Sequence, residues 1–411
     1  MSEPVYILGG AQSDFARNFS REGLDISTMM RDVIFSGLSA AKLDPSDIEV
    51  VHVGNFVAEL FCHQGMLGGI VAGLGPEFAG LPTGRHEAAC ASGSLAVLGA
   101  MRDIEAGQYD LACVLGVEYM RNVDGATGAK YLGAAAMAGE EWTDARFLWP
   151  RAFSDLTEEY TRRYGEVSYD HIGAIAKKNY DNARRNPNAQ TRNWSFSNAS
   201  FEKDDIANPV IEGHVRKADC GQITDGGAVV FLASEKRARQ YAAQRGTTVE
   251  TLPRIKGWGH KTGPMRFRDK LAQSKDAPLV FPHVAQTIQN AFGRAGINHV
   301  TDLNGLETHD CFAMTEYMAI DHFGITAPGE SWKAVEEGMT EMNGTIPINA
   351  SGGLIGLGHP VGATGVRMVL DCFKQTSGQA GDYQIEGAQN MATLNIGGSL
   401  TTAVSFVIGR D

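Results

Sequence analysis

The length, composition and charge of the chain limit the kinds of protein it can be. It has 411 residues, of which 43% are hydrophobic, and it carries a formal net charge of −12 at pH 7. A chain of this size can bury large cores in two or three domains. The acidic balance argues against nucleic acid as a partner, because a polyanion binds to a basic surface. No uncharged apolar run reaches 18 residues, so the sequence predicts no membrane-spanning helix and no membrane partner.

The cysteines and the two ends of the chain point to a compartment. The six cysteines are widely spaced and form no CxxC or CxxH pattern; they are Cys62, Cys90, Cys113, Cys220, Cys311 and Cys372. This spacing suggests neither a disulfide framework nor a zinc site. The first residues contain no basic segment followed by an apolar one, and the last three residues are not a peroxisomal signal. We therefore expect reduced thiols, no bound metal and a cytoplasmic location.

The first predicted elements are a helix and a strand. Apolar residues recur at helical spacing from Met29 to Leu43, and the turn residues 44–47 lead into the β-branched run Val50–Val53. This order predicts the beginning of an α/β unit.

A second helix is predicted to begin at a cysteine. Small residues surround Cys90, and apolar residues then recur at helical spacing until Gly107, at Leu95, Leu98, Met101 and Ile104. The apolar segment 111–117 follows as a buried strand. A cysteine in such a place is usually only a small buried hydrophobe. At a helix N-terminus it can also be a nucleophile, because the helix dipole favours the thiolate.

The alternation of helix and strand patterns breaks down from about residue 119 to 217. The segment 125–139 is rich in Ala and Gly, and the segment 142–201 is aromatic, basic and rich in Asn. Between Arg146 and Lys203, ten Lys and Arg residues stand against seven Asp and Glu residues, although the whole chain is acidic. Such an excess is either an ordinary solvated surface or a patch for an anionic ligand.

The second half of the chain repeats the pattern of the first. The segment Val284–Phe292 predicts a helix and Leu303–Leu306 a strand, and a glycine-dense turn at 349–365 then opens the helical run Val366–Phe373. This pseudo-repeat predicts parallel strands with right-handed crossovers. In such folds ligands lie at the carboxyl ends of the strands, where helix N-termini point.

The glycine-dense turn carries a histidine, His359, followed by Pro360. Glycines let the backbone pass close to a ligand, and the proline fixes one backbone dihedral beside the histidine. A loop of this kind can position a base, although a Gly-His-Pro sequence alone is more often only a turn.

Taken together, these motifs resemble those of the thiolase family. Cys90-Ala-Ser-Gly93 resembles the family's nucleophile motif, and Gly358-His359-Pro360 followed by Gly362-Ala-Thr-Gly365 resembles its second signature, in the same order along the chain. The resemblance covers nearly the whole chain, and the segment 142–201 is its least similar part.

The resemblance implies a fold and a domain organisation. The fold class is α/β, a thiolase fold of two pseudo-repeated five-stranded mixed-sheet halves packed as layers. The N-terminal half would cover residues 1–250 and the C-terminal half residues 251–411. A loop domain inserted at about 119–217 would lie over the active site and bind coenzyme A (CoA), with the basic segment near the CoA phosphates.

Two further motifs resemble one branch of the family, the sterol-carrier-protein type of thiolase. Many thiolases have Asn-Glu-Ala-Phe where this chain has His309-Asp-Cys-Phe312, and Cys-x-Gly where this chain has Asn395-Ile-Gly397. The sterol-carrier-protein type has the His-Asp-Cys-Phe form and lacks the terminal cysteine. By this resemblance the second acid/base thiol is Cys311. No appended sterol-carrier domain is expected, because the resemblance already runs to Val407.

The resemblance also assigns roles to the catalytic residues. Cys90 would carry the acyl group as a thioester, with His359 beside it favouring the thiolate. His309 and His359 would each donate to an oxyanion, and the backbone amides of Cys90 and Gly397 would form the acyl-thioester hole. Without the other motifs, His309 and Cys311 would be interpreted as the polar end of a strand.

The predicted function is that of an acyl-CoA C-acyltransferase, a 3-ketoacyl-CoA thiolase or acetyl-CoA acetyltransferase. CoA is expected as a substrate, with no permanently bound cofactor; the glycines around Gly356 do not complete G-x-G-x-x-G, because Val361 stands at the last position. Expected partners are acyl-CoA, CoA, further copies in a homodimer or a dimer of dimers, and a small accessory protein.

Two alternatives remain at this stage. One is an acyltransferase or aldolase of the same fold that acts on a different acceptor. The other is a non-catalytic acyl-CoA-binding subunit, against which two thiols and two histidines in the motifs argue.

Overall fold

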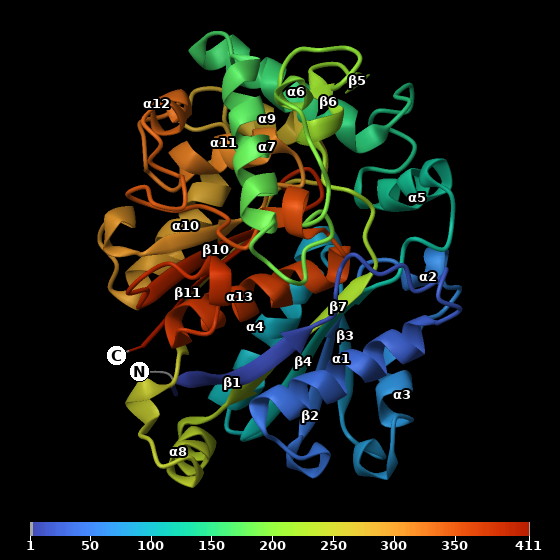
Figure 1. Cartoon of the computed structure of the whole chain (residues 1–411), viewed down its shortest axis with the longest axis vertical. Helices are drawn as coiled ribbons and strands as arrows, with labels where there is room; N and C mark the ends of the chain where they lie inside the picture. The colour runs from blue at the N-terminus through green and yellow to red at the C-terminus, as the bar shows by residue number, and fades with distance from the viewer. Residues whose placement is uncertain (1–2, 411) are drawn as a thin grey trace.

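The strands form two half-sheets that meet edge to edge. The computed structural model describes residues 3–410 (Figure 1). The strand order of the N-terminal half-sheet is β3 (Thr83–His86), β2 (Val50–Gly54), β4 (Leu111–Glu118), β7 (Gly226–Ala233), β1 (Val5–Gln12). The C-terminal half-sheet continues with β8 (Arg254–Thr262), β11 (Thr402–Gly409), β10 (Asn390–Gly397), β9 (Gly305–Thr308). Two antiparallel residue pairs, Val5 with Ile255 and Tyr6 with Arg254, join β1 to β8.

Both half-sheets are mixed and follow the same plan. Strand β2 runs parallel to β3 and β4, and β9 runs parallel to β10. The other pairs, β4 with β7, β7 with β1, β10 with β11 and β11 with β8, are antiparallel. The predicted α/β fold of two mixed-sheet halves is therefore confirmed.

The C-terminal half differs from the prediction in its fifth strand. Among residues 3–410 this half has four strands, and the place beyond β9 is taken by Ile348, which forms an isolated parallel bridge with Leu306. Pro347 has no N–H to donate, and Asn349 has a left-handed backbone with φ 57°. The fifth strand is therefore confined to Ile348, because Pro347 before it cannot donate and Asn349 after it begins a turn.

Two helices fill the space between the half-sheets. Helices α4 (Ser92–Glu105) and α13 (Thr364–Ser377) pack against each other, and their apolar side chains form one buried cluster with the inner faces of the strands. A Cβ on Gly93 would lie 2.7 Å from the carbonyl oxygen of Gly362, so the beginnings of the two helices approach to backbone contact. The N-termini of two central helices, one from each half, thus lie together.

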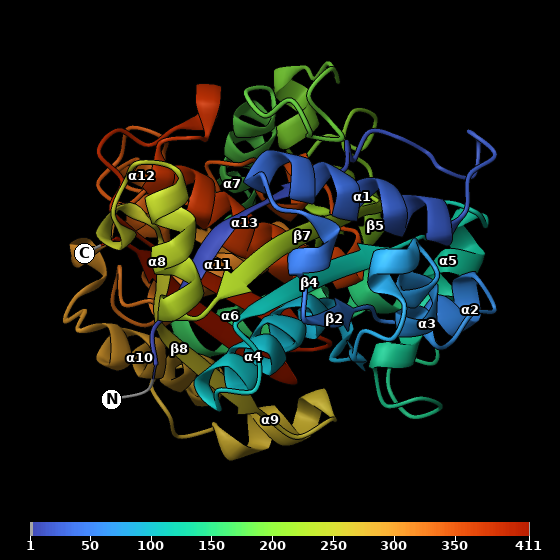
Figure 2. The ribbon, with the colours of Figure 1, turned by 90° about the horizontal axis from the view of Figure 1, so that it is seen from below.

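Further helices cover the outer faces of the half-sheets. Helices α1 (Ile26–Ala41) and α8 (Glu235–Gln244) pack on the N-terminal half-sheet, and α10 (Pro282–Ala295) and α11 (Ala313–His322) on the C-terminal half-sheet. Figure 2 shows α1 and α4 on opposite faces of β4 and β7. The layers are therefore helix, sheet, helix, sheet, helix. Short helices complete these halves: α2 (Ala58–Phe61), α3 (Leu67–Ala72), α9 (Phe267–Gln273) and α12 (Ser331–Glu336).

The segment without a regular pattern is folded as an inserted unit between β4 and β7. It contains α5 (Gly125–Leu132), α6 (Leu148–Tyr164), α7 (Tyr169–Ala183) and the hairpin of β5 (Val210–Glu212) and β6 (Val215–Arg216). Figure 1 shows α6 and α7 beside α9 and α11, which belong to the C-terminal half. We call residues 119–217 the loop domain. The boundary proposed at 250/251 falls between α8 and β8.

The elements predicted from periodicity correspond to observed ones. The predicted helices at 29–43 and 284–292 are α1 and α10, and the predicted strand at 50–53 is β2. Strand β9 begins at Gly305, two residues later than predicted, because a 3₁₀ turn occupies Val300–Asp302. Within residues 3–410, no helix is both long and apolar enough to cross a membrane.

Candidate active site

Cys90 lies in a strained turn at the start of α4. It is the central residue of the 3₁₀ turn η3 (Ala89–Ala91), and Ala89 has φ +50°, a conformation that costs free energy for a residue with a side chain. The Ser92 hydroxyl holds this turn, because its oxygen accepts from the Ala88 amide at 3.0 Å and donates to the Ala89 carbonyl at 2.6 Å. The turn presents Cys90 at the N-terminus of a long helix, as the sequence predicted.

His359 is held by a series of unusual backbone turns. The π-helical turn η9 (Gly353–Leu357) is flanked by Gly352 with φ +106° and Gly358 with φ +123°, values that L-residues rarely adopt. The His359 amide donates to Thr224 Oγ1 at 3.0 Å, and its ring Nδ1 lies 2.6 Å from Thr364 Oγ1. The scaffold therefore holds both the backbone and the ring of His359.

His309 and Cys311 follow directly after β9. The His309 amide donates to the Leu394 carbonyl at 2.8 Å, which extends the pairing of β9 with β10 by one residue. The His309 ring is 1% exposed, and its Nδ1 lies 3.2 Å from Asn395 Nδ2 and 3.4 Å from the Ile396 amide nitrogen. The Cys311 carbonyl accepts from the Gly221 amide at 2.8 Å.

Three of the four predicted catalytic side chains converge. The sulfur of Cys90 and one ring nitrogen each of His309 and His359 all lie within 4.8 Å of one another. The two imidazole rings are perpendicular, with centroids 5.3 Å apart. Among residues 3–410 this is the one such group close enough to hold a metal ion. Cys311 is outside this group, although it faces the same cavity.

The cavity in front of these residues has a volume of about 330 Å³ and is mainly apolar. Cys90, Cys311 and His359 form part of its wall, and the buried His309 lies against Cys90 and His359. The loop domain supplies many of the other lining residues, among them Ala129, Leu132, Leu148, Trp149, Phe153 and Lys217. A second cavity of about 290 Å³ adjoins it, because Lys217 and Gln222 line both.

Burial keeps the thiol and both imidazoles neutral. Loss of water raises the pKa of Cys90 to about 12, although the backbone amide of Gly398 acts in the opposite direction by bonding to the sulfur. Burial, together with the charge of Arg367, lowers the pKa of His359 to about 3, and burial also holds the pKa of His309 well below its usual range. Burial raises the pKa of the Cys311 thiol as well. Burial of Cys90 therefore acts against the thiolate that a helix N-terminus and a neighbouring imidazole would favour.

Gly398, the residue after the predicted oxyanion-hole glycine Gly397, lies on the cavity wall. The motif Asn395-Ile-Gly397 predicts the amide of Gly397, and the structure places the next residue, Gly398, on the cavity wall with its amide bonded to the Cys90 sulfur. Gly398 has φ +62°, which turns the backbone at the end of β10. The family motif ends at Gly397, so no sequence pattern points to Gly398.

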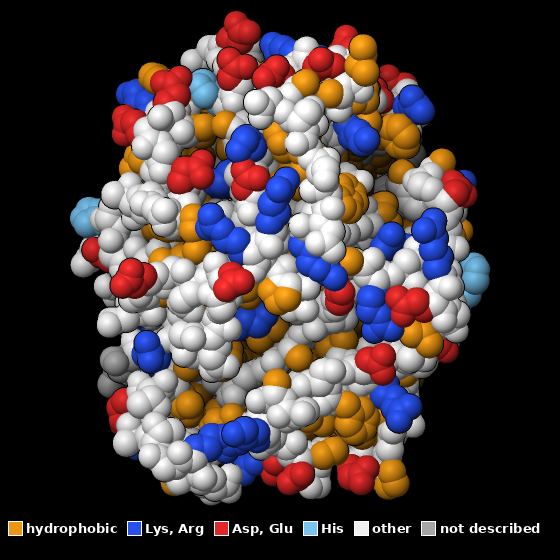
Figure 3. Space-filling model, viewed as in Figure 1, with side chains coloured by type: hydrophobic (Ala, Val, Ile, Leu, Met, Phe, Trp, Pro, Cys, Tyr) orange, Lys and Arg blue, Asp and Glu red, His pale blue; other side chains and the backbone are white. Residues whose placement is uncertain are grey.

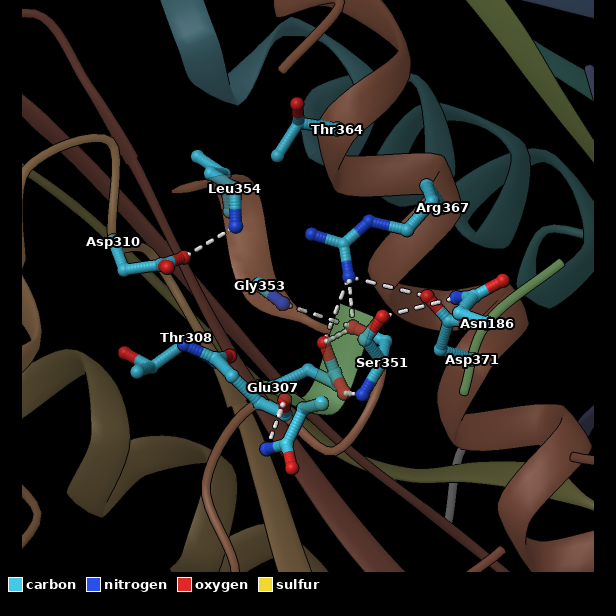
Figure 4. Close-up of polar contacts among 12 residues, drawn as sticks. Asn186, Glu307, Thr308, Asp310, Ser351, Gly353, Leu354, Thr364, Arg367 and Asp371 are labelled. Atoms are coloured by element: carbon cyan, nitrogen blue, oxygen red, sulfur yellow. Dashed lines mark hydrogen bonds and ion pairs between the residues drawn. The ribbon is translucent and has the colours of Figure 1, made fainter. Parts of the chain in front are cut away.

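Buried polar contacts support the turns that carry His309 and His359 (Figure 4). The Asp310 carboxylate accepts from the Leu354 amide at 2.5 Å and from the Ile355 amide at 3.3 Å, so it caps η9 and joins the turn at 309–311 to the segment before His359. Asn179 of α7 also donates to Asp310 at 2.8 Å. The only signal in the sequence for this role of Asp310 is its place within the His-Asp-Cys-Phe motif.

A fully buried arginine lies beneath these turns. Arg367 Nη1 donates to Glu307 Oε2 at 2.7 Å, Ser351 Oγ at 3.0 Å and Asp371 Oδ2 at 3.1 Å. Glu307 belongs to β9 and Ser351 to the turn that leads to His359, so one guanidinium connects both catalytic segments to α13 (Figure 4). Nothing in the sequence distinguished this arginine from a surface residue of a helix.

Comparison with known proteins identifies matching families and relatives. Residues 5–236 match the model described as "Thiolase, N-terminal domain", and residues 267–410 match "Thiolase C-terminal domain-like". An acetyl-CoA acetyltransferase of Methanothermobacter thermautotrophicus is 31% identical over 99% of both chains. Sterol carrier protein 2 of Gallus gallus is 25% identical over 100% of this chain and 72% of its own. Among solved structures, one titled Ltp2-ChsH2(DUF35) aldolase superposes with a TM-score of 0.77 at 18% identity, over 99% of this chain and 98% of the other.

The protonation state of Cys90 leads to a testable pH dependence. Iodoacetamide reacts with the thiolate, and a pKa of about 12 leaves the thiol protonated throughout the neutral range. We expect the alkylation rate of Cys90 to rise about tenfold per pH unit from roughly pH 6 to 9 without a plateau. Peptide mapping after timed labelling measures this rate, with Cys90→Ser as the control for the site. A rate that is already constant at pH 6–7 would mean that a thiolate–imidazolium pair exists at rest.

Proposed function

The chain is a member of the thiolase family, and we propose that it interconverts a 3-ketoacyl-CoA plus CoA with a shortened acyl-CoA plus acetyl-CoA through a thioester on Cys90. This is the activity of an acyl-CoA C-acyltransferase. The observation that carries the proposal is the convergence of Cys90, His309 and His359 within 4.8 Å at the end of an apolar cavity. A nucleophile, a base and a hydrogen-bond donor at one point are what acyl transfer to and from a thiol requires.

In the cleavage direction, the Cys90 sulfur attacks the keto carbon of the 3-ketoacyl-CoA. The neutral His359 takes the thiol proton as the carbon–sulfur bond forms. The bond between the α-carbon and the keto carbon then breaks, which leaves the acyl group on Cys90 and an acetyl-CoA enolate. Cys311 gives a proton to the enolate carbon. The thiol of CoA then attacks the thioester on Cys90 and gives its proton to the Cys311 thiolate, and the Cys90 sulfur that leaves takes back the proton held by His359. Condensation is the same sequence in reverse.

The other groups stabilise the charges that develop on oxygen. The backbone amides at Cys90 and at the Gly397–Gly398 turn receive the oxygen of the acyl group on Cys90. His309 and His359 receive the enolate oxygen. His309 can donate as a neutral ring, because burial holds its pKa low. His359 donates through the hydrogen that it has taken from the Cys90 thiol.

CoA is proposed as a substrate that binds under the loop domain. Lys217 lies on the wall shared by the two cavities and can meet a phosphate or the polar part of the pantetheine arm. Figure 3 shows Lys and Arg side chains gathered over α7 and the loops beside it, with acidic side chains among them. This distribution agrees with a mildly basic entrance for an anionic substrate.

One alternative is supported by a specific observation. The solved structure with the TM-score of 0.77 is titled an aldolase with a DUF35 partner, and retro-aldol cleavage would need the same base but no acyl-cysteine. At 18% identity this likeness concerns the fold. It also supports the proposal that a small accessory protein assembles with this chain.

The reaction itself is the first test. We expect the protein to convert acetoacetyl-CoA and free CoA into acetyl-CoA, and Cys90→Ala to abolish this turnover together with the acetyl label on the peptide that contains residue 90. Cys62→Ser is a matched control, because Cys62 is also half-buried but lies outside the cavity wall; its turnover should equal that of the unmodified protein. Acetyl-CoA formation that survives Cys90→Ala would exclude the covalent route.

The role of Cys311 can be separated from that of Cys90. Asn395 stands where many thiolases have a cysteine, and an amide does not titrate near neutral pH, so Cys311 is the remaining thiol on the cavity wall that belongs to a family motif. We expect Cys311→Ala to be acylated at Cys90 but to lose α-proton exchange and condensation together, by roughly 10²–10⁴-fold. Exchange of deuterium into acetyl-CoA and mass spectrometry of the acylated peptide measure the two steps. Normal exchange in this variant would contradict the assignment, and a loss of acylation as well would mean that Cys311 supports Cys90 instead.

We propose a homodimer, formed through the outer edge of β3. Strand β3 is the last strand of its half-sheet, and Met66 of the adjacent loop is 84% exposed. An exposed sheet edge beside an apolar side chain favours pairing with a second copy. Sedimentation at micromolar concentration should give about twice the 44.1 kDa mass of the chain. A mass equal to that of one chain would contradict the proposal.

The six free cysteines agree with a reducing compartment, and we propose the cytoplasm.

A further inference from the structure

Asn395 occupies the position at which many thiolases have a cysteine, and its amide is fully used. The side chain is 0% exposed and lies on β10 between the two catalytic segments. Its Oδ1 accepts from Ser94 Oγ at 2.8 Å, and its Nδ2 donates to the Cys90 carbonyl at 3.1 Å. The same Nδ2 lies 3.2 Å from Nδ1 of His309.

The orientation of the Asn395 amide follows from one partner. The Cys90 backbone carbonyl can only accept a hydrogen bond, so the group that faces it must be the NH₂ and not the oxygen of Asn395. The nitrogen that faces His309 is therefore also a donor. Ser94, on α4, agrees with this orientation because its hydroxyl can donate to the Asn395 oxygen.

Two donors consequently face Nδ1 of His309. One is Asn395 Nδ2 at 3.2 Å, and the other is the backbone amide of Ile396 at 3.4 Å, which can only donate. A hydrogen on Nδ1 would point at both of them. In the neutral ring the hydrogen is therefore on Nε2, and Nδ1 carries the lone pair.

We propose that Asn395 is a positioning residue that holds His309 in the Nε2–H form and so makes it a hydrogen-bond donor to the enolate oxygen. The proposal rests on the proposed function for the role of the donor, but not for the position of the hydrogen. The same arrangement makes His309 a poor metal ligand, because a metal ion would need the lone pair on Nε2. The cluster of Cys90, His309 and His359 is therefore suited to acyl transfer and not to binding a metal ion.

The groups around His309 keep its ring neutral, so they can change only which ring nitrogen carries the hydrogen. The titratable and charged groups that face it from the packed elements are Cys90, His359 and Arg367, and those on its own turn are Asp310 and Cys311. Burial and the positive charge of Arg367 both disfavour a charged His309. Control over a neutral ring must therefore act through its hydrogen-bond partners.

Two substitutions of Asn395 separate positioning from packing. Asn395→Asp keeps the shape but places carboxylate oxygens near Nδ1, which draws the hydrogen to Nδ1 and removes the donor at Nε2. Asn395→Ala removes the side chain but leaves the Ile396 amide in place. We expect α-proton exchange to fall about 10²-fold in the Asp variant, the effect of losing one oxyanion donor, and to fall less in the Ala variant. A role in packing alone would give the opposite order, because Asp is nearly isosteric with Asn.

A pH series gives a second readout. Protonation of His309 places hydrogens on both nitrogens, so the imidazolium can donate from Nε2 even beside a carboxylate. We expect the ratio of the Asp variant's exchange rate to that of the unmodified protein to rise as the pH falls from about 8 to 6, since the new carboxylate raises the pKa of His309. A ratio that does not change with pH would contradict the proposal.

The position of the hydrogen can also be observed directly. In ¹⁵N spectra of histidine-labelled protein, protonated and unprotonated ring nitrogens are distinct, and the His309 signals can be assigned by their loss in His309→Gln. We expect Nε2–H in the unmodified protein and in the control Ser94→Ala, which keeps the Asn395 donor, and Nδ1–H in Asn395→Asp. Nδ1–H in the unmodified protein would overturn the proposal even if the variants do not fold. Failure of the acetyl-CoA assay with Nε2–H observed would instead reject the proposed function and leave the positioning role supported.

Discussion

The close approach of two helix N-termini is the constraint on which the rest of this structure depends. Helices α4 and α13 come from opposite halves of the chain and meet at glycines. A Cβ on Gly93 would lie 2.7 Å from the Gly362 carbonyl oxygen, and a Cβ on Gly365 would overlap the backbone nitrogen of Ser94 in α4. A larger residue at either place would push the helices apart. Cys90 at the start of α4 and His359 before α13 reach one another because neither glycine has a side chain.

Burial then decides which chemistry this meeting point can perform. A helix N-terminus and an imidazole would favour a thiolate, but the loss of water raises the pKa of Cys90 to about 12 and lowers that of His359 to about 3. The centre at rest therefore holds neutral groups, and the thiol proton must move while the sulfur attacks. The positions of single hydrogens on His309 and His359 then determine which ring nitrogen donates and which accepts. Those positions are set by neighbours such as Asn395 and Thr364.

The loop domain takes part in this arrangement through buried polar contacts. Asn179 of α7 donates to Asp310 at 2.8 Å and to Glu316 at 2.7 Å, and Lys178 forms a buried ion pair with Glu316. Asp310 in turn caps the π-helical turn before His359. The part of the chain that lines the cavity is thus connected to the turns that hold the catalytic groups. A buried network of this kind is costly to disturb. Removing one member leaves its partner charged in the interior, without an ion pair and without water.

Much of this protein follows from its sequence alone. Helical and strand periodicity predicted α1, β2, α4, β4, α10 and α13 close to their observed bounds, because each of these elements has one apolar face or is wholly apolar. The motifs around Cys90 and His359 also predicted that both lie at helix N-termini. These are local properties, since spacing and the glycine and proline content of a short segment determine them.

The tertiary structure alone decided the rest, because the remaining properties depend on partners far away in the chain. The fifth strand of the C-terminal half is reduced to Ile348, since Pro347 cannot donate and the left-handed backbone of Asn349 ends the extended conformation. The neutral state of Cys90 depends on how completely the folded chain excludes water, which no motif records. The partner of His309 is Asn395, 86 residues away, and Arg367 joins Glu307 to α13 across 60 residues. A sequence pattern fixes which groups are present, but only the folded chain determines which donor faces which acceptor and how much water remains between them.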